Sequence, residues 1–453
     1  MLRRDEFRVG WPQRLTSLFA FSAARQPYMV RRNYRHELRS AFTFPLAMAM
    51  AEGAFAGVVA GKYFDASQLL LAVITAAPMF GNIVALFWSQ VAEGRRKVPV
   101  INALQVGVAV AVAAVGLTWF VPDVNGKPPE YAGWIFAALI VVARVCASGV
   151  ITLRSAVWRS NYPTSSRARI VGRITVVYMA TLAVLTTGGA LFLDYMPASY
   201  AVMYPLFAAI SAVGIYEFSR IRVRGEASQL ADQPTSRKRV GPIRAYADQV
   251  AAGLALLRED RVFAKYQWFQ FLLGVSFMFA LPSLYYMVSK EMTDPDRQYT
   301  LAVIVLSLLP VVASTLSIQL WAPLYDRMTL FRFRTLQGWF ILVCQATILV
   351  GAVMDQLWIV AVGMLLQGIC FGGGQLAWQL GQHAFAGPDR IAQYMGVHVM
   401  LTGVRGCLAP FFGVGMYHLL GRPVFAVSLV FSAIGVAGYW WMSRRFVLPG
   451  EKA

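Results

Sequence analysis

Twelve apolar stretches of about 20 residues each are the feature that most constrains how this chain can fold. Six lie within about 37–219 and six within about 266–443. As a helix, a stretch of this length crosses the roughly 30 Å hydrocarbon core of a bilayer. Because 58% of the residues are hydrophobic and only 14% are charged, lipid must form part of the solvent. The sequence predicts an all-α membrane protein with twelve transmembrane helices in two six-helix halves.

One long polar interval separates the two sets of stretches. Residues 225–240 are too polar and rich in turn-forming residues to fold alone. After them, an apolar stripe at helical spacing predicts an amphipathic helix on the membrane surface: Ile243, Tyr246, Val250, Leu254 and Leu257. We therefore expect an N-terminal arm at 1–36, a first helical half at 37–219, a linker at 220–265, a second half at 266–443 and a C-terminal tail at 444–453.

The positive charge of the chain is placed unevenly. The net charge is +19, and most of the 41 lysines and arginines fall in the N-terminal arm, in alternate loops and in the C-terminal tail. Segments that keep such charge are typically cytoplasmic. The pattern predicts a multi-pass protein of a bacterial inner membrane with both termini in the cytoplasm. A nucleic-acid role is not expected, because no contiguous basic face with interleaved aromatic residues is present.

Motifs of soluble enzymes are absent from the sequence. It contains no Walker loop, GxSxG or HExxH motif. The four cysteines lie in apolar spans without CxxC spacing, and the histidines at 383, 398 and 418 do not form a set with the spacing of metal ligands. We therefore expect no enzymatic activity, no cofactor and no metal site.

Two short loop sequences occupy matching positions in the two halves. The loop between spans 2 and 3 contains Gly94-Arg95-Arg96-Lys97, and the loop between spans 8 and 9 contains Asp326-Arg327. With these loops, and with two six-span halves joined by a linker, residues 37–443 resemble the major facilitator superfamily. That family carries G-x-x-x-D-R-x-G-R-R at both positions. Here Val91 and Ala92 replace the Asp and Arg of the first copy, and Thr329 replaces a glycine of the second.

The resemblance implies transport by alternating access, with spans 1, 4, 7 and 10 around a central cavity. It also implies that the two loops act as a cytoplasmic gate, and the residues that would carry this role are Gly94, Arg95, Asp326 and Arg327. Charges at helix ends can pair in one state and separate in another. The alternative is that these basic residues only determine topology.

Three ionisable residues lie well inside the spans: Glu52 in span 1, Arg144 in span 4 and Arg405 in span 11. Each costs about 2.5–3.5 kcal/mol at the centre of a bilayer. Glu52 and Arg144 lie at similar depth, so an ion pair between them is expected. Arg144 can bind an anionic group of a solute and Glu52 can carry a proton. The alternatives are a static pair, and a structural or gating role for Arg405.

Span 10 is also unusually polar. Gln367 is expected near the midplane, and Gln375 and Trp378 nearer the cytoplasm. These side chains can hydrogen-bond a polar solute or satisfy one another between helices. In span 7, Gln267, Trp268 and Gln270 at the cytoplasmic end and Tyr285 and Tyr286 near the other end are expected to be interfacial anchors.

These residues favour a secondary active transporter of a small organic solute, working as a proton-coupled symporter or antiporter or as an exchanger. Two basic residues against one acid within the spans favour an anionic or zwitterionic solute. The expected partners are that solute, the lipid bilayer and a coupling proton, and the expected state is a monomer. Two alternatives stay open: an efflux pump for amphiphilic drugs or lipids, and a non-transporting assembly factor or scaffold.

Overall fold

The structure is a computed structural model. It describes residues 22–23, 26–123, 128–231, 242–294, 297–386 and 390–448. Most of the expected N-terminal arm, linker residues 232–241 and the end of the C-terminal tail lie outside these residues.

Within the described residues, twelve helical spans are long and apolar enough to cross a membrane, which confirms the predicted fold class. The helices of the first half are α2 (Arg31–Thr43), α3 (Pro45–Met50), α4 (Gly53–Lys62), α5 (Gln68–Val91), α6 (Lys97–Val115), α7 (Glu130–Asn161), α8 (Thr164–Tyr195) and α9 (Tyr200–Ser219). The linker contains α10 (Glu226–Ala231) and α11 (Pro242–Glu259). The second half contains α12 (Arg261–Tyr286), α13 (Tyr299–Val303), α14 (Leu309–Arg327), α15 (Leu330–Val353), α16 (Leu357–Leu380), α17 (Ile391–Leu420) and α18 (Val424–Arg445).

Short turns extend several of these spans. They are η3 (Tyr28–Val30), η4 (Gly116–Phe120), η5 (Pro197–Ser199) and η8 (Gly381–Ala384), with wider π-helical turns at η6 (Met287–Glu291) and η7 (Ile304–Leu308).

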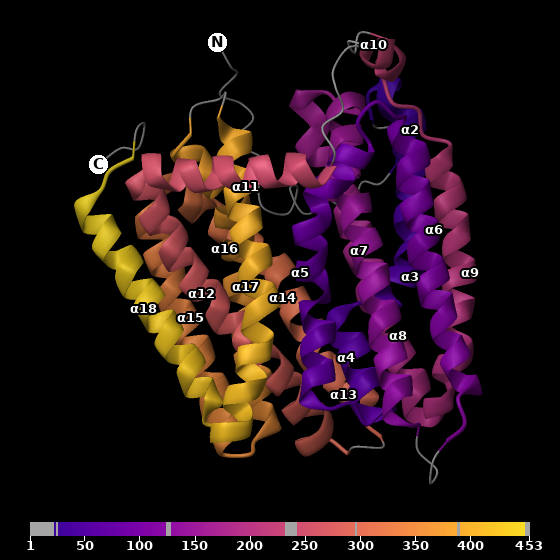
Figure 1. Ribbon diagram of the computed structural model, residues 1–453, viewed down its shortest axis with the longest axis vertical. Coiled ribbons are helices and arrows are strands. Elements are labelled where there is room, and N and C mark those ends of the chain that lie inside the picture. Colours follow the sequence, from indigo (N-terminus) through magenta and orange to yellow (C-terminus); the bar gives the residue numbers. More distant parts are fainter. Residues whose placement is uncertain are drawn as a thin grey trace.

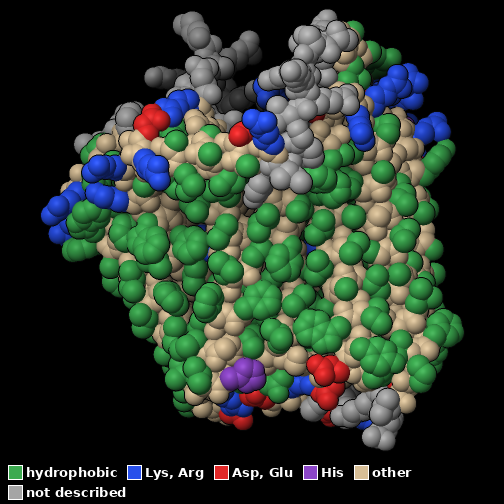
Figure 2. All heavy atoms as spheres, in the orientation of Figure 1, with side chains coloured by type: hydrophobic (Ala, Val, Ile, Leu, Met, Phe, Trp, Pro, Cys, Tyr) green, Lys and Arg blue, Asp and Glu red, His purple; other side chains and the backbone are tan. Residues whose placement is uncertain are grey.

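The two halves stand side by side, and α11 lies across one end of the second half (Figure 1). We call this the α11 end and the opposite one, where α4 and α13 meet, the Lys62 end. Apolar side chains cover the flank between the two ends, while Lys and Arg gather at the α11 end (Figure 2). An exposed apolar surface of this extent, on helices long enough to span a bilayer, is expected to contact lipid.

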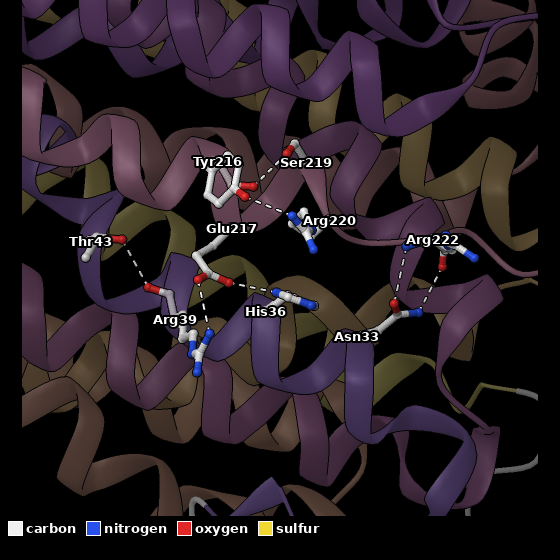
Figure 3. Close-up of polar contacts among 9 residues, drawn as sticks. All are labelled: Asn33, His36, Arg39, Thr43, Tyr216, Glu217, Ser219, Arg220 and Arg222. Carbon is white, nitrogen blue, oxygen red and sulfur yellow. Dashed lines mark hydrogen bonds and ion pairs between the residues drawn. The ribbon is translucent and has the colours of Figure 1, made fainter.

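Span 1 differs from its prediction as one helix from about residue 40 to 61. It begins at Tyr28, so the expected end of the arm at residue 36 falls inside α2. Contacts with α9 explain the early start. His36 and Arg39 both bind the carboxylate of Glu217, at 2.7 and 3.2 Å. Asn33 exchanges two hydrogen bonds with the backbone of Arg222 (Figure 3).

The linker helix packs against protein as well as facing outward. Helix α11 contacts α17 and α12 of the second half and α5 of the first. Among the side-chain positions of α11 that the structure describes, Gly253 and Leu256 are buried, whereas Leu254 of the predicted stripe is 49% exposed; Ile243 and Tyr246 of the stripe lie outside the described positions. The next helix starts before the expected end of the linker at residue 265, because the Asp260 carboxylate caps α12 by accepting two backbone N–H groups.

Helices α12 and α17 cross in close contact at Gly413. A Cβ atom at this position would lie 1.8 Å from the carbonyl oxygen of Phe279. We expect Gly413→Ala to destabilise the protein by roughly 1–3 kcal/mol, because a backbone atom cannot move aside as a side chain can. Thermal unfolding in detergent measures the loss. Gly415→Ala is the matched control, since no atom lies within 4 Å of its added Cβ. Equal effects of both substitutions would show that helix propensity, not the crossing, sets the cost.

Candidate functional site

Glu52 lies where span 1 is interrupted. Helix α3 ends at Met50 and α4 begins at Gly53, and Glu52 between them has an extended backbone. Its carboxylate accepts hydrogen bonds from the backbone N–H groups of Ala54, at 2.8 Å, and Phe55, at 3.1 Å. It therefore caps α4 and interacts favourably with the positive end of the helix dipole. The membrane-embedded acid thus has a local structural partner that the sequence did not reveal.

Arg144 lies in α7, partly buried. Its Nε atom is buried and has no hydrogen-bond partner among the described residues. Within the same residues, no ion pair joins Arg144 to Glu52, contrary to the expected pair. The reason is geometric, because the Glu52 carboxylate turns toward the first backbone N–H groups of α4. The Nε–H group of Arg144 is therefore an unpaired hydrogen-bond donor among the described residues.

Two tyrosines complete the surroundings of these charges. Tyr178 of α8 and Tyr285 of α12 each lie within electrostatic range of both Glu52 and Arg144. Tyr285 belongs to the second half and packs on Gly57 of α4, where a Cβ atom would lie 2.7 Å from its ring. The site therefore combines a carboxylate, a guanidinium cation and two phenols, and both halves contribute to it.

The three span-10 residues that were predicted to bind solute do not lie with Glu52 and Arg144. Gln367 lines a cavity of about 20 Å³ inside the second half, together with Gln345 and Ser428. That volume holds a water molecule but not an organic solute. Gln375 is exposed, and the Trp378 ring lies 5.4 Å from that of His398.

Arg405 is buried between α17 and α12, where its Nη1 donates to the carbonyl of Gln270. Gln267 and Gln270 are buried too, so their prediction as interfacial anchors is wrong. None of Gln367, Gln375, Trp378 and Arg405 makes a described contact with Glu52 or Arg144.

The predicted gate residues are at the α11 end. Gly94 has a φ of 69°, a left-handed conformation that favours glycine at the turn after α5. Arg95, Asp326 and Arg327 are exposed, and none of them forms an ion pair with a described residue. The structure therefore leaves their gating role untested.

A group of side-chain hydrogen bonds and ion pairs joins the two halves at the Lys62 end. Lys62, at the end of α4, is only 7% exposed. Its ammonium donates to the hydroxyl of Thr293, at 2.9 Å, and to the carbonyls of Asp294 and Arg297. From its sequence position, Lys62 was only a charge in a loop. It is in fact a buried contact between halves.

Two acids of the first half strengthen this contact. Asp194 accepts hydrogen bonds from the backbone N–H groups of Tyr299 and Thr300, at the start of α13. Asp65 forms an ion pair with Lys290. The Lys62 end is therefore closed by charged contacts.

A second buried acid was missed because it stands at the edge of a span. Glu37 of α2 is 1% exposed and accepts hydrogen bonds from the Nε of Arg154, at 2.9 Å, the indole of Trp158 and the hydroxyl of Tyr162. The three donors are spaced four residues apart from Arg154 through Tyr162, a spacing that places them on one side of a helix end. This spacing was the available signal.

Comparison with known proteins identifies the family. The family model described as Major Facilitator Superfamily matches residues 40–410. No protein of curated function matches the sequence. Among solved structures, the nucleoside transporter NupG is similar with a TM-score of 0.64 and 13% identity, covering 91% of this chain and 100% of NupG. The partially occluded inward-open xylose transporter XylE from E. coli gives a TM-score of 0.64 at 11% identity, covering 94% and 100%.

A bacterial homologue of the human lysosomal transporter Spinster, in an inward-facing and occupied conformation, gives a TM-score of 0.59 at 13% identity, covering 91% of this chain and 97% of that one. The family model covers most of the chain, so this protein belongs to the major facilitator superfamily. It is a multi-pass membrane transporter and not an enzyme. The identities are low, and the likeness to the solved structures is one of fold.

Proposed function

We propose that the protein is a secondary active transporter of a small organic anion or zwitterion, coupled to a proton or a counter-substrate. The observation that carries the proposal is the buried Nε of Arg144, which has no described partner, in a region where Arg144 and Glu52 both lie within electrostatic range of Tyr178 and Tyr285. A guanidinium binds carboxylate or phosphate groups through two parallel hydrogen bonds. An anionic solute would supply the acceptors that Arg144 lacks.

The Glu52 cap suggests how a proton could be coupled to the solute. The first N–H groups of a half-helix attract anions in transporters with interrupted spans. Here the Glu52 carboxylate already occupies those of Ala54 and Phe55. A proton on Glu52 removes its negative charge and weakens this cap. The N-terminal end of α4 could then attract a solute anion together with Arg144. Solute and proton would then bind together.

The contacts between halves suggest which state the structure represents. We propose that the α11 end is cytoplasmic in a bacterial inner membrane, with both termini on that side, as the positive charge there indicates (Figure 2). The Lys62 end would then face the outer side of the membrane. Because that end is closed, the structure would represent the inward-facing state of a monomer. Arg95, Asp326 and Arg327 would pair when the α11 end closes in the opposite state.

A thermal-shift screen of the purified protein tests the proposal. It uses pools of organic anions, zwitterions, sugars, cations and lipids at mildly acid and neutral pH. A ligand at 100 times its dissociation constant stabilises the folded state by about 2.7 kcal/mol. We expect anions or zwitterions to stabilise the wild type and Arg159→Ala but not Arg144→Ala. Arg159 is the matched control, because it is an exposed arginine on the same helix.

Uptake of the best ligand into proteoliposomes then separates transport from binding. We expect accumulation by the wild type, driven by an inwardly directed proton gradient or by a counter-substrate, and none by Arg144→Ala. Stabilisation by cations or amphiphiles that is unaffected at position 144 would instead favour an efflux pump. Absence of any stabilising ligand would favour a scaffold.

A further inference from the structure

Two arginines lie buried together inside the second half. Arg334 of α15 is 2% exposed and Arg405 of α17 is 5% exposed. They meet at Gln270 of α12, where Arg334 donates to the side-chain oxygen and Arg405 to the backbone carbonyl. Arg334 was not among the ionisable residues expected well inside the spans, because it stands near the start of one. The structure instead places two guanidinium groups around one residue, within the apolar core of a helical bundle.

Neutral groups are the only described partners of these two charges. Besides Gln270, Arg334 donates to Gln337, at 2.6 Å, and to the hydroxyl of Tyr439, at 3.3 Å, and it lies over the Tyr439 ring. Among the described residues, no carboxylate forms an ion pair with either arginine. Charges buried in proteins are normally paired, because desolvation is expensive. The same chain follows that rule in its first half, where Arg154 is paired with Glu37.

Unused hydrogen-bond donors surround the pair. The Nε atoms of Arg334 and Arg405 and the Nε2 of Gln267 are buried without a partner among the described residues. The Gln267 oxygen is 3.0 Å from Nδ1 of His398, which must carry the hydrogen of that bond because an amide oxygen only accepts. The open Nε2 of His398 is then a proton acceptor. Three donors and one acceptor thus lack partners at this site, and two of the donors belong to the two arginines themselves.

The size of the missing partner is limited by packing. A Cβ atom on Gly274 would lie 2.1 Å from the guanidinium carbon of Arg405, so the arginine already fills the groove beside α12. An organic solute would not fit in such packing, but a monatomic anion requires little more room than a water molecule.

We propose that Arg334 and Arg405 hold a buried monovalent halide, chloride in the cell, as a counter-ion inside the second half. Helices α12, α15 and α17 supply Gln267, Arg334 and Arg405 respectively, so the anion joins three helices and offsets the repulsion between the two buried arginines. The inference does not rest on the proposed solute, because Arg144 is in the first half. It predicts a protein whose stability depends on chloride whatever solute it carries.

The first test is thermal unfolding of the purified full-length protein in detergent. Sodium chloride is replaced by sodium gluconate at equal ionic strength, and chloride or bromide is then titrated back. We expect the Tm to rise saturably by about 2–5 °C. Arg405→Gln should lose this response, and Arg144→Gln, the matched membrane-embedded arginine of the first half, should keep it. A wild type that is indifferent to halide, or a response lost only in Arg144→Gln, would overturn the proposal.

A second measurement needs only the wild type, in case Arg405→Gln does not fold. Equilibrium binding of radioactive chloride is expected to give about one site per chain, with bromide competing. In crystals grown in bromide, an anomalous peak should lie between Arg334 and Arg405. Absence of saturable binding, or a peak at another place, would refute the site.

Discussion

Replacement of Glu37 by alanine is expected to destabilise the folded protein by about 3–5 kcal/mol, because it leaves the charge of Arg154 buried without its partner. Glu37 accepts hydrogen bonds from Arg154, Trp158 and Tyr162, and all three donors lose their acceptor at once. The contact also ties α2 to the far end of α7. We expect a lower Tm in detergent and a lower yield of folded protein. Thermal unfolding of the purified variant measures the change.

Two further variants separate the buried charge from a general effect of removing a carboxylate. Glu259→Ala removes an acid that is paired with Arg390 on the surface, and it should cost no more than about 1 kcal/mol. In the double variant Glu37→Leu and Arg154→Leu, much of the loss should return, since no charge is then left unpaired. If the double variant were as unstable as the sum of the two single ones, packing rather than charge would explain Glu37.

Replacement of Lys62 by alanine is expected to open the Lys62 end. The ammonium makes three hydrogen bonds to the segment Thr293–Arg297, and hydrogen bonds to charged groups contribute about 1.5–3 kcal/mol each. A loss of about 3 kcal/mol from the closed state alone changes the ratio of states by roughly 100-fold. A cysteine placed at the buried Ser289, against Gly61, reports the opening. We expect a membrane-impermeant thiol reagent to label it at least about 10-fold faster in Lys62→Ala.

Arg422→Ala is the control for this experiment. Arg422 lies at the same end but binds Glu291, Asp355 and a carbonyl of its own half. Its loss should leave the labelling rate of the cysteine unchanged. The protein without the cysteine at position 289 corrects for the four native cysteines. Equal labelling of Lys62→Ala and the parent would mean that Lys62 does not hold the two halves together.

The fold could be predicted because it depends on properties that a sequence displays directly. Apolar runs long enough to cross a bilayer determine the spans, and the placement of Lys and Arg indicates topology. The matching loops around Gly94 and Asp326 indicated the family, which the comparison confirmed. Each of these signals is local, or repeats in a regular way along the chain.

The surroundings of the candidate site could be predicted less well. Glu52 was recognised as a costly residue, but an apolar run does not show that a helix stops and restarts around it. Arg334 was not singled out because it stands near the start of a span, yet α15 begins four residues earlier and carries it into the core. The partners of Lys62 lie more than 200 residues away in the chain. Such pairings arise from packing of the two halves, which no local pattern specifies.

The position of α11 gives the linker a mechanical consequence. Because α11 rests on α17 and α12 and also touches α5, it bridges the two halves at the end opposite Lys62. If the two halves rock as the proposed transport requires, α5 must slide along α11 or the two helices must separate. An antibody fragment that bound α5 and α11 together would therefore be expected to inhibit transport without contacting the solute site.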